Sequence, residues 1–129
     1  MQRISGQTYE QFLSENIFNK LNMIHTGVDH TGKIISNKAT GYSVGTGTNG
    51  IAQASWYDIN FETGSGSLYS TTGDLLKWLQ AIKNKTLFDF TSLPYPFGWG
   101  KREYFKNNKS IEQSGFFKWI FILHWLISI

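Results

Sequence analysis

Two stretches of this sequence carry an apolar stripe at helical spacing, and they constrain the fold more than any other feature. The first spans residues 8–22, where apolar side chains recur at intervals of one, three or four positions: Tyr9, Phe12, Leu13, Ile17 and Leu21. Thr8 and Gln11 match the capping-box pattern that begins a helix. Asn22 tolerates the left-handed conformation that often ends one. The pattern therefore predicts a helix over residues 8–22.

The second stretch spans residues 70–84 and predicts a second helix. Ser70 or Thr71 can cap its first turn, where the negative charge of Asp74 suits the helix dipole. Lysines, which suit the opposite end of the dipole, stand at the C-terminal end: Lys83 and Lys85. The spacing of the apolar residues predicts a buried face made of Leu75, Leu76, Leu79 and Ile82.

The sequence between these helices, residues 24–66, is rich in Gly, Thr, Ser and Asn and has no sustained period. It predicts loops with short strands near Lys33–Ile35 and Ala39–Val44. Gly45–Gly50 is expected to be the most flexible part of the chain.

A hairpin is predicted after the second helix. Pro94 and Pro96 form a turn, and two strand-like runs follow at Phe97–Gly100 and Ser110–Gly115. The polar connection between the two runs contains a basic group of Lys101, Arg102, Lys106 and Lys109. We interpret this group as a solvated hairpin tip, because a net charge of +3 on 129 residues gives little support for nucleic-acid binding.

The composition fits one small folded domain. Aromatic residues make up 16% of the 129 residues, which is enough apolar bulk for a core. The chain has no cysteine, which rules out disulfides, thiol catalysis and thiolate metal sites. No cofactor is expected. The first residues lack an apolar segment, so no signal peptide is expected either.

The last 14 residues, 116–129, differ from the rest because 11 of them are apolar. The polar exceptions are Lys118, His124 and Ser128. The segment is too short to span a bilayer. A buried strand, a buried helix and an unpaired apolar end all remain open interpretations.

Three further patterns are weak as functional signals. Gly45–Gly50 matches G-x-G-x-x-G, but the residues after it are a poor start for a helix. Gly41–Gly45 matches the nucleophile elbow G-x-S-x-G around Ser43, but glycines and threonines follow where a helix should begin. The histidines are too few and too irregularly spaced for a metal site, so none is expected: His25, His30 and His124.

An ordered set of segments resembles the serine β-lactamase and penicillin-binding-protein family. SGQTYEQFLSENIFNKLNM resembles the helix after that family's second catalytic motif. GSGSLYSTTGDLLKWLQAI resembles its glycine-rich turn entering a helix, and Ala39–Tyr42 resembles a short signature between the two. Phe97–Gly100 and Ile111–Gly115 resemble the strand pair that ends at the third catalytic motif. The resemblance covers about residues 3–115, and the nearer branch includes D-Ala-D-Ala carboxypeptidase-like and esterase-like proteins.

This resemblance implies an α+β fold, part of a β-lactamase/transpeptidase-like domain with two helices, short strands and a hairpin of an antiparallel sheet. It implies acyl transfer on a lactam, a D-Ala-D-Ala peptide or an ester. The intact family takes small-molecule or peptidoglycan-like substrates and usually acts outside the cytoplasm, at the bacterial cell envelope. Its nucleophile is the serine of S-x-x-K, and its third motif, K/H-x-G, lines the site on an edge strand.

The family's catalytic motifs are incomplete here. None of the 12 serines has a lysine three positions later, and no tyrosine has Asn or Ser two positions later. The S-x-N match at Ser14–Asn16 lies inside the first predicted helix. A remnant of the third motif, resembling a substrate-binding site, remains at Gln113, Ser114, Gly115 and Phe116. Gln stands where the family has His or Lys.

We therefore expect a partial hydrolase domain over residues 1–115 and an atypical apolar tail over residues 116–129. The leading hypothesis is a C-terminal-half fragment that is inactive alone and self-associates through exposed apolar faces. One alternative is a non-catalytic binding or complementing module that docks on another protein. A third is membrane-surface binding by the aromatic tail with Lys118.

Overall fold

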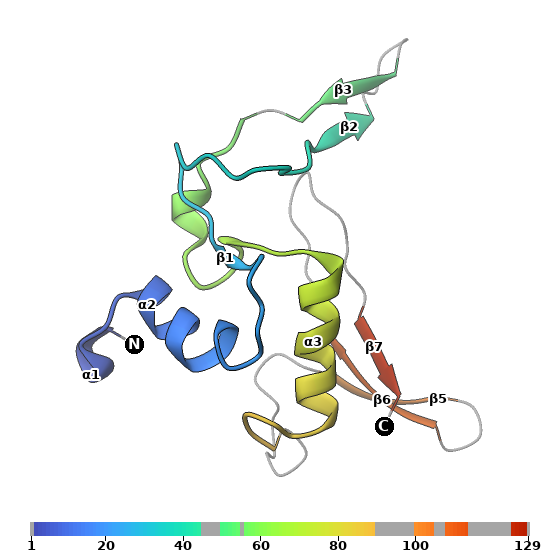
Figure 1. Cartoon of the computed structure of the whole chain (residues 1–129). Coiled ribbons are helices and arrows are strands. Elements are labelled where there is room, and N and C mark those ends of the chain that lie inside the picture. Colours follow the sequence, from blue (N-terminus) through green and yellow to red (C-terminus); the bar gives the residue numbers. More distant parts are fainter. Residues whose placement is uncertain are drawn as a thin grey trace. The chain divides into compact units, whose positions relative to one another are not determined.

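The computed structural model describes residues 2–44, 50–54, 56–89, 100–104, 108–113 and 125–128 (Figure 1). The chain divides into two compact units. The first is built from Met1–Thr31 and Ile59–Pro96, and the second from Gly32–Asp58 and Phe97–Ile129. Within the described residues, no helix has the length and apolarity needed to cross a membrane.

The first unit opens with helical turns that include the helix predicted over residues 8–22. A short helix α1 (Gln2–Ser5) comes before α2 (Tyr9–Leu13), which continues directly into the π-helical η1 (Ser14–Phe18). The capping box is present: the Thr8 hydroxyl accepts from Gln11 N at 3.2 Å, and Gln11 Oε1 accepts from Thr8 N at 3.0 Å. These reciprocal bonds satisfy two donors that a helix start leaves open.

The predicted helix differs from the observed one in its second half. There the backbone bonds span five residues, as in Asn19 N to Ser14 O (2.9 Å) and Met23 N to Phe18 O (2.8 Å). The wider turn marks a π-helix, which periodicity alone does not reveal. Asn22 has a φ of 53°, so the left-handed helix end predicted at this residue is confirmed.

The second predicted helix is confirmed as α3 (Thr72–Lys83), and Thr71 is the residue that caps it. The Thr71 hydroxyl accepts from Asp74 N at 3.2 Å. The predicted buried face is correct only in part, because Leu76 is 55% exposed and Leu75 and Leu79 are half-buried. Ile82 is buried as expected, and Ala81 and Asp74 are buried beside it.

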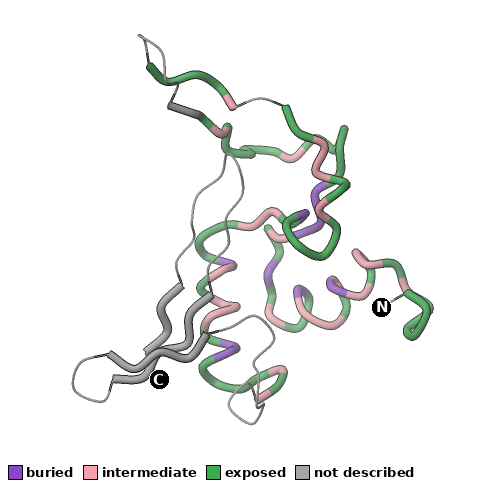
Figure 2. Tube along the Cα trace, turned by 180° about the vertical axis from the view of Figure 1, so that it is seen from behind, coloured by how far each residue is buried: buried purple, intermediate pink, exposed green. Residues whose placement is uncertain are grey.

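The hydrophobic core of this unit lies between α2, η1 and the segment that follows them. Its buried members are Leu13, Phe18, Met23 and Val28. Partly buried side chains pack against them, from the same helical segment and from α3: Tyr9, Ile17, Leu21 and Trp78. Burial raises the pKa of the Tyr9 hydroxyl. Figure 2 shows the buried residues in purple, on the helical segments and on the chain that leads from them to β1.

A two-residue ladder joins distant parts of the first unit. Strand β1 (Gly27–Val28) pairs antiparallel with β4 (Leu68–Tyr69), which leads into α3. A 3-10 helix, η2 (Ile59–Glu62), comes before β4. The strand predicted at Lys33–Ile35 is wrong: these residues form no strand, and β1 lies a few residues earlier.

In the part of the second unit that the structure describes, the strands form two antiparallel sheets. The smaller one pairs β2 (Tyr42–Val44) with β3 (Ile51–Gln53). Residues 45–49, the connection expected to be most flexible, lie outside the described residues. The larger sheet has the order β5 (Gly100–Tyr104), β6 (Asn108–Gln113) and β7 (Trp125–Ser128).

The predicted hairpin is confirmed by the pairing of β5 with β6, which include the predicted residues 100 and 110–113 but extend further toward the turn, to Tyr104 and Asn108. Lys101 and Arg102 belong to β5 and Lys109 belongs to β6, so these residues are not a loop. Lys109 stands opposite Glu103 in the register. The pairing between β5 and β6 extends both strands into the segment that we predicted as a polar connection. The polar composition of that segment did not indicate strands. Lys106 and residues 91–99, including both prolines, lie outside the described residues.

The apolar tail contributes the third strand of this sheet. Strand β7 pairs antiparallel with β6, with Ser110 opposite Ser128 and Gln113 opposite Trp125. A strand is thus the correct one of the three interpretations for residues 125–128. The predicted boundary at residue 115 lies outside the described residues and stays a prediction. Helices with short antiparallel strands confirm the α+β fold class.

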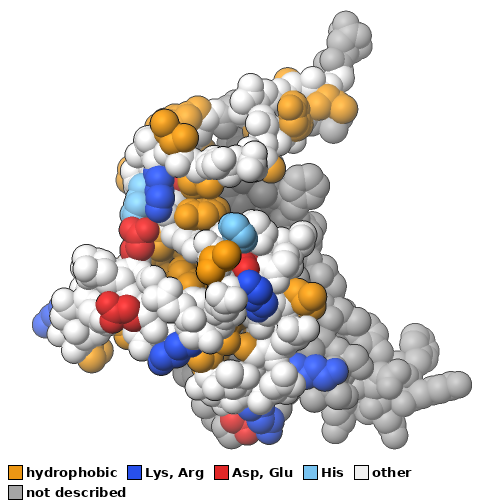
Figure 3. Space-filling model, in the orientation of Figure 1, with side chains coloured by type: hydrophobic (Ala, Val, Ile, Leu, Met, Phe, Trp, Pro, Cys, Tyr) orange, Lys and Arg blue, Asp and Glu red, His pale blue; other side chains and the backbone are white. Residues whose placement is uncertain are grey.

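Apolar side chains also reach the surface of the first unit, among charged and polar ones (Figure 3). The most exposed are Ile4 (94%), Phe61 (82%) and Ile24 (72%).

Candidate functional site

The predicted third-motif remnant lies at the end of β6. Gln113 is the last residue of β6 and pairs with Trp125 of β7. Ser114, Gly115 and Phe116 lie outside the described residues, so their role in a substrate site stays a prediction. The edge position that the resemblance implied is wrong, because β6 is the middle strand between β5 and β7.

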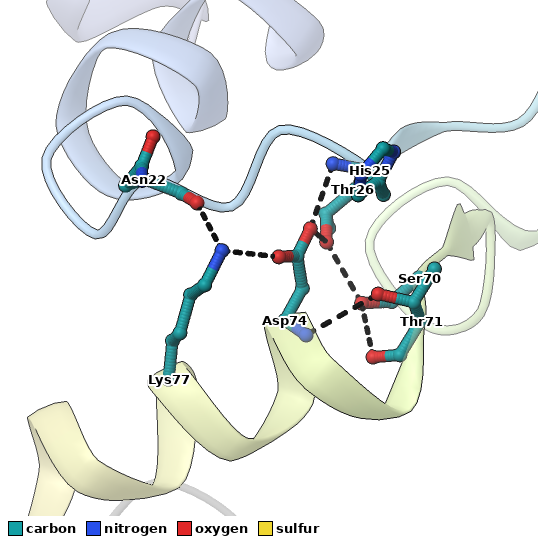
Figure 4. A network of polar contacts seen from close by, with 7 residues as sticks. All are labelled: Asn22, His25, Thr26, Ser70, Thr71, Asp74 and Lys77. Carbon is teal, nitrogen blue, oxygen red and sulfur yellow. Dashed lines mark hydrogen bonds and ion pairs between the residues drawn. The ribbon is translucent and has the colours of Figure 1, made fainter.

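A cluster of polar contacts in the first unit forms around Asp74, in the first turn of α3 (Figure 4). We call it the Asp74 cluster; its members are Asn22, His25, Thr26, Ser70, Thr71, Asp74 and Lys77. Three members come from the segment between η1 and β1, two come from the residues just before α3, and two come from the first turns of α3. The cluster therefore ties together two parts of the chain that are about 50 residues apart.

The Asp74 carboxylate is 1% exposed, and both its oxygens accept hydrogen bonds. Oδ2 accepts from the backbone N–H of His25 at 2.7 Å and from the Thr26 hydroxyl at 3.0 Å. Oδ1 accepts from Lys77 Nζ at 2.8 Å. Lys77 Nζ also donates to the carbonyl of Asn22. A buried charge is tolerated when it is paired and bonded in this way.

The electrostatics of the cluster favour the charged form of Asp74. Burial by itself raises the pKa of the carboxyl group. The hydrogen bonds from Lys77, His25 N–H and Thr26, together with the Lys77 charge, outweigh burial and hold the pKa below its usual value. Asp74 is therefore an anion near neutral pH, and its lone pairs are directed at groups of its own chain.

The hydroxyl groups of the cluster are also engaged within the chain. Ser70 Oγ lies 2.7 Å from Thr26 Oγ1 and 3.4 Å from the Thr71 carbonyl oxygen. Thr71 caps α3. Neither of these contacts is to a histidine or lysine that could act as a general base. These hydroxyl groups hold the start of α3 and the segment before β1 in place. A catalytic serine would instead bond to its general base.

The elbow and dinucleotide patterns do not form the local structures that their chemistry requires. Ser43 lies inside β2, opposite Ala52, and not at a turn from a strand into a helix. The residues that follow Gly50 form β3 and not a helix, so no helix N-terminus faces this loop from its C-terminal side. Ser14–Asn16 lies in η1, where the Asn16 side chain donates to the Phe12 carbonyl at 2.9 Å.

The histidines take up separate positions. His25 contributes its backbone N–H to the Asp74 cluster, whereas the His30 ring lies 3.3 Å from Glu10 at the surface. His124 lies outside the described residues. In the part of the chain that the structure describes, no three His, Cys, Asp or Glu side chains come together as a metal site would require.

The sequence indicated for Asp74 only a charge that suits the helix dipole. In the structure its side chain is buried and bonds to the segment before β1. A signal was present in the sequence: Asp74, Trp78 and Ala81 are four and three residues apart, which places the carboxylate on the inward stripe of α3. Thr26 could not be found in this way, because its partners lie 44 and 48 residues later.

Comparison with known proteins agrees with the segments that resemble the serine hydrolases. The sequence model of the Beta-lactamase family matches residues 1–109, which include α2, α3 and the Asp74 cluster. The human protein "Putative beta-lactamase-like 1" is 35% identical over 74 residues, which are 57% of this chain and 14% of the human protein. The chain thus spans a small part of the length of that relative. From the family match over most of its length, this chain belongs to the Beta-lactamase family.

Proposed function

We propose that this chain is part of a serine-hydrolase domain that transfers acyl groups from a lactam, a D-Ala-D-Ala peptide or an ester. Within that domain its residues supply structural support and one wall of the substrate site, through Gln113 and the three residues after it. Membership of the Beta-lactamase family supports the reaction class.

We further propose that the chain forms no acyl-enzyme by itself. The observation that carries this proposal is the use of hydroxyl groups at the Asp74 cluster: Thr71 caps α3, and Ser70 bonds to Thr26. In addition, no serine of the sequence has a lysine three positions later. Without an activated serine the covalent step is lost, because an ordinary hydroxyl is a weak nucleophile near neutral pH.

Intact-mass spectrometry after incubation with a fluorescent penicillin tests this proposal. We expect no covalent adduct on the chain, whereas an intact penicillin-binding protein, which releases the acyl group slowly, becomes labelled in a parallel sample. A stoichiometric adduct would overturn the proposal, and peptide mapping would then locate it. Ser70→Ala with Ser14→Ala as a matched variant would show whether the Asp74 cluster holds the reactive hydroxyl.

A second function, docking on another hydrolase polypeptide, is supported by the exposed apolar side chains of the first unit, Ile24 and Phe61 among them. In this case the partner supplies the S-x-x-K serine. We would mix the chain with a polypeptide that carries S-x-x-K and Y-x-N, and measure hydrolysis of a chromogenic cephalosporin. Activity in the mixture that Ile24→Asp reduces would support docking. No complex and no activity would reject it.

A further inference from the structure

The three-stranded sheet of the second unit has two outer strands of different chemistry. Strand β6 is paired on both sides, by β5 and by β7. Over the described residues, the outer sides of β5 and β7 pair with no other strand. A strand with an open side presents a row of backbone N–H and C=O groups that another strand can pair with.

The sequence of β5 opposes such pairing and the sequence of β7 favours it. Three of the five residues of β5 are charged: Lys101, Arg102 and Glu103. Charges on an edge strand are a common means of preventing association. The four residues of β7 are Trp-Leu-Ile-Ser, with no charge, proline or glycine. Aromatic and β-branched residues without charge are the composition that promotes strand addition.

We propose that β7 is the contact through which two copies of this chain associate, with the two β7 strands paired antiparallel about a two-fold axis. In a full-length pairing of this kind, Leu126 of one copy stands opposite Ile127 of the other, and Trp125 opposite Ser128. Apolar residues of the two copies then face each other across the axis, and the two three-stranded sheets join into one continuous sheet of six strands.

Strand β7 of a second copy fits this edge better than strand β5 of a second copy does. Pairing β7 of one copy with β5 of the next would place Leu and Ile opposite Lys101, Arg102 and Glu103. It would also be a head-to-tail contact, which continues into open assemblies and does not close as a dimer. The charges of β5 disfavour that contact, so the self-complementary β7 pair is the one that the sequence supports. Strand β7 also lies beyond the residues that match the family model, 1–109.

Sedimentation velocity over a range of concentrations tests the association. Four residues from each copy make a small contact, so we expect a reversible dimer with a dissociation constant on the order of 10–100 µM. A wild-type chain that stays monomeric at about 1 mM, well above that range, would overturn the proposal. So would assembly into open-ended oligomers in place of dimers.

A charge-swap pair identifies the strand that makes the contact. One variant carries Leu126→Lys and Ile127→Lys, and the other carries Leu126→Glu and Ile127→Glu. Each variant alone should associate at least about tenfold more weakly than the wild type, because like charges face each other. An equimolar mixture should restore the dimer. Unchanged dimers in either variant alone, or no recovery in the mixture, would place the contact elsewhere.

Disulfide trapping gives a test that does not depend on how the charged variants fold. The chain has no cysteine, so a single introduced cysteine can crosslink only to a second copy. We expect a mixture of Leu126→Cys and Ile127→Cys to form crosslinked dimers under mild oxidation. Tyr104→Cys, on the other outer strand, is the matched control and should crosslink at least about tenfold less. Equal crosslinking from both edges would contradict the proposal.

Discussion

Asp74 shows how one side chain can hold two segments of a chain together. Its carboxylate accepts from His25, Thr26 and Lys77, and removing it leaves the His25 N–H without its partner. We expect Asp74→Ala to lower the free energy of unfolding by about 2–4 kcal/mol. Lys77→Gln should cost less, about 1–2 kcal/mol, because it removes the positive partner of the buried carboxylate but leaves the bonds from His25 and Thr26 in place. Urea unfolding measures both, and equal losses would contradict this account of the cluster.

The same carboxylate makes stability depend on acid. The pKa of Asp74 is lower in the folded chain than in the unfolded one. Its contribution is therefore complete above the unfolded pKa of about 4 and is lost as the pH falls through the folded pKa. We expect the stability difference between wild type and Asp74→Asn to shrink between pH 5 and the most acid conditions, since those pH values cross the pKa of about 4. A difference that stays constant with pH would show that the charge of Asp74 contributes nothing.

Two glycines should respond in opposite ways to alanine. A Cβ added at Gly27 would lie 2.7 Å from Tyr69 Oη and 2.9 Å from Cζ, so either the Tyr69 ring or the β1–β4 pair must shift. We expect Gly27→Ala to cost about 1–3 kcal/mol. Gly73 lies in the first turn of α3, and the nearest atom to an added Cβ is 4.0 Å away. Gly73→Ala should therefore stabilise by about 0.5–1 kcal/mol. Thermal unfolding of both variants is the measurement.

At the level of elements, the helices were predictable because their signals are local. Thr8 and Gln11 are three residues apart, and so are Thr71 and Asp74, so a cap can be found within one turn of sequence. The strands were less predictable, because β1 depends on β4, which lies 40 residues later in the chain. Lys33–Ile35 has the composition of a strand, but these residues form no strand in the described structure.

The two caps allow a direct comparison at this scale. Thr8→Ala removes one side of a reciprocal pair at α2, and Thr71→Ala removes the hydroxyl that receives Asp74 N–H. Each should cost about 1 kcal/mol. The double variant should cost the sum, because the caps belong to different helices. Thr8→Ser keeps the hydroxyl and serves as the control. A loss as large in Thr8→Ser as in Thr8→Ala would contradict the role of the cap.

The candidate site was less predictable than the helices. The third-motif pattern indicated Gln113, whose place at the end of β6 fits the expected strand. The pattern did not predict that β7 would pair with the second side of β6, because the apolar tail that supplies β7 does not resemble the strands of the family. The contacts of Asp74 join residues 48 and 49 positions apart, and no local pattern encodes such a pairing.

For the whole molecule, the small core of the first unit leads us to expect a modest stability. Among the residues of this unit whose burial the structure describes, the buried apolar side chains are few: Leu13, Phe18, Met23, Val28, Ala81 and Ile82. We expect a free energy of unfolding at or below the lower end of the usual range, about 5 kcal/mol. Urea titration at several protein concentrations measures it. A value near 10 kcal/mol at the lowest concentration would contradict this expectation.

The bonds of Asp74 also bear on how the chain folds and how it can vary. They close a loop of 49 residues, from His25 to Asp74. Closing such a loop costs entropy before any contact is gained, so α2 and α3 should form early and meet late. That entropy grows only with the logarithm of loop length, and doubling the loop costs about 0.6 kcal/mol. The glycine-rich segment between the helices can therefore gain or lose residues during evolution while the two helical parts keep the same attachment.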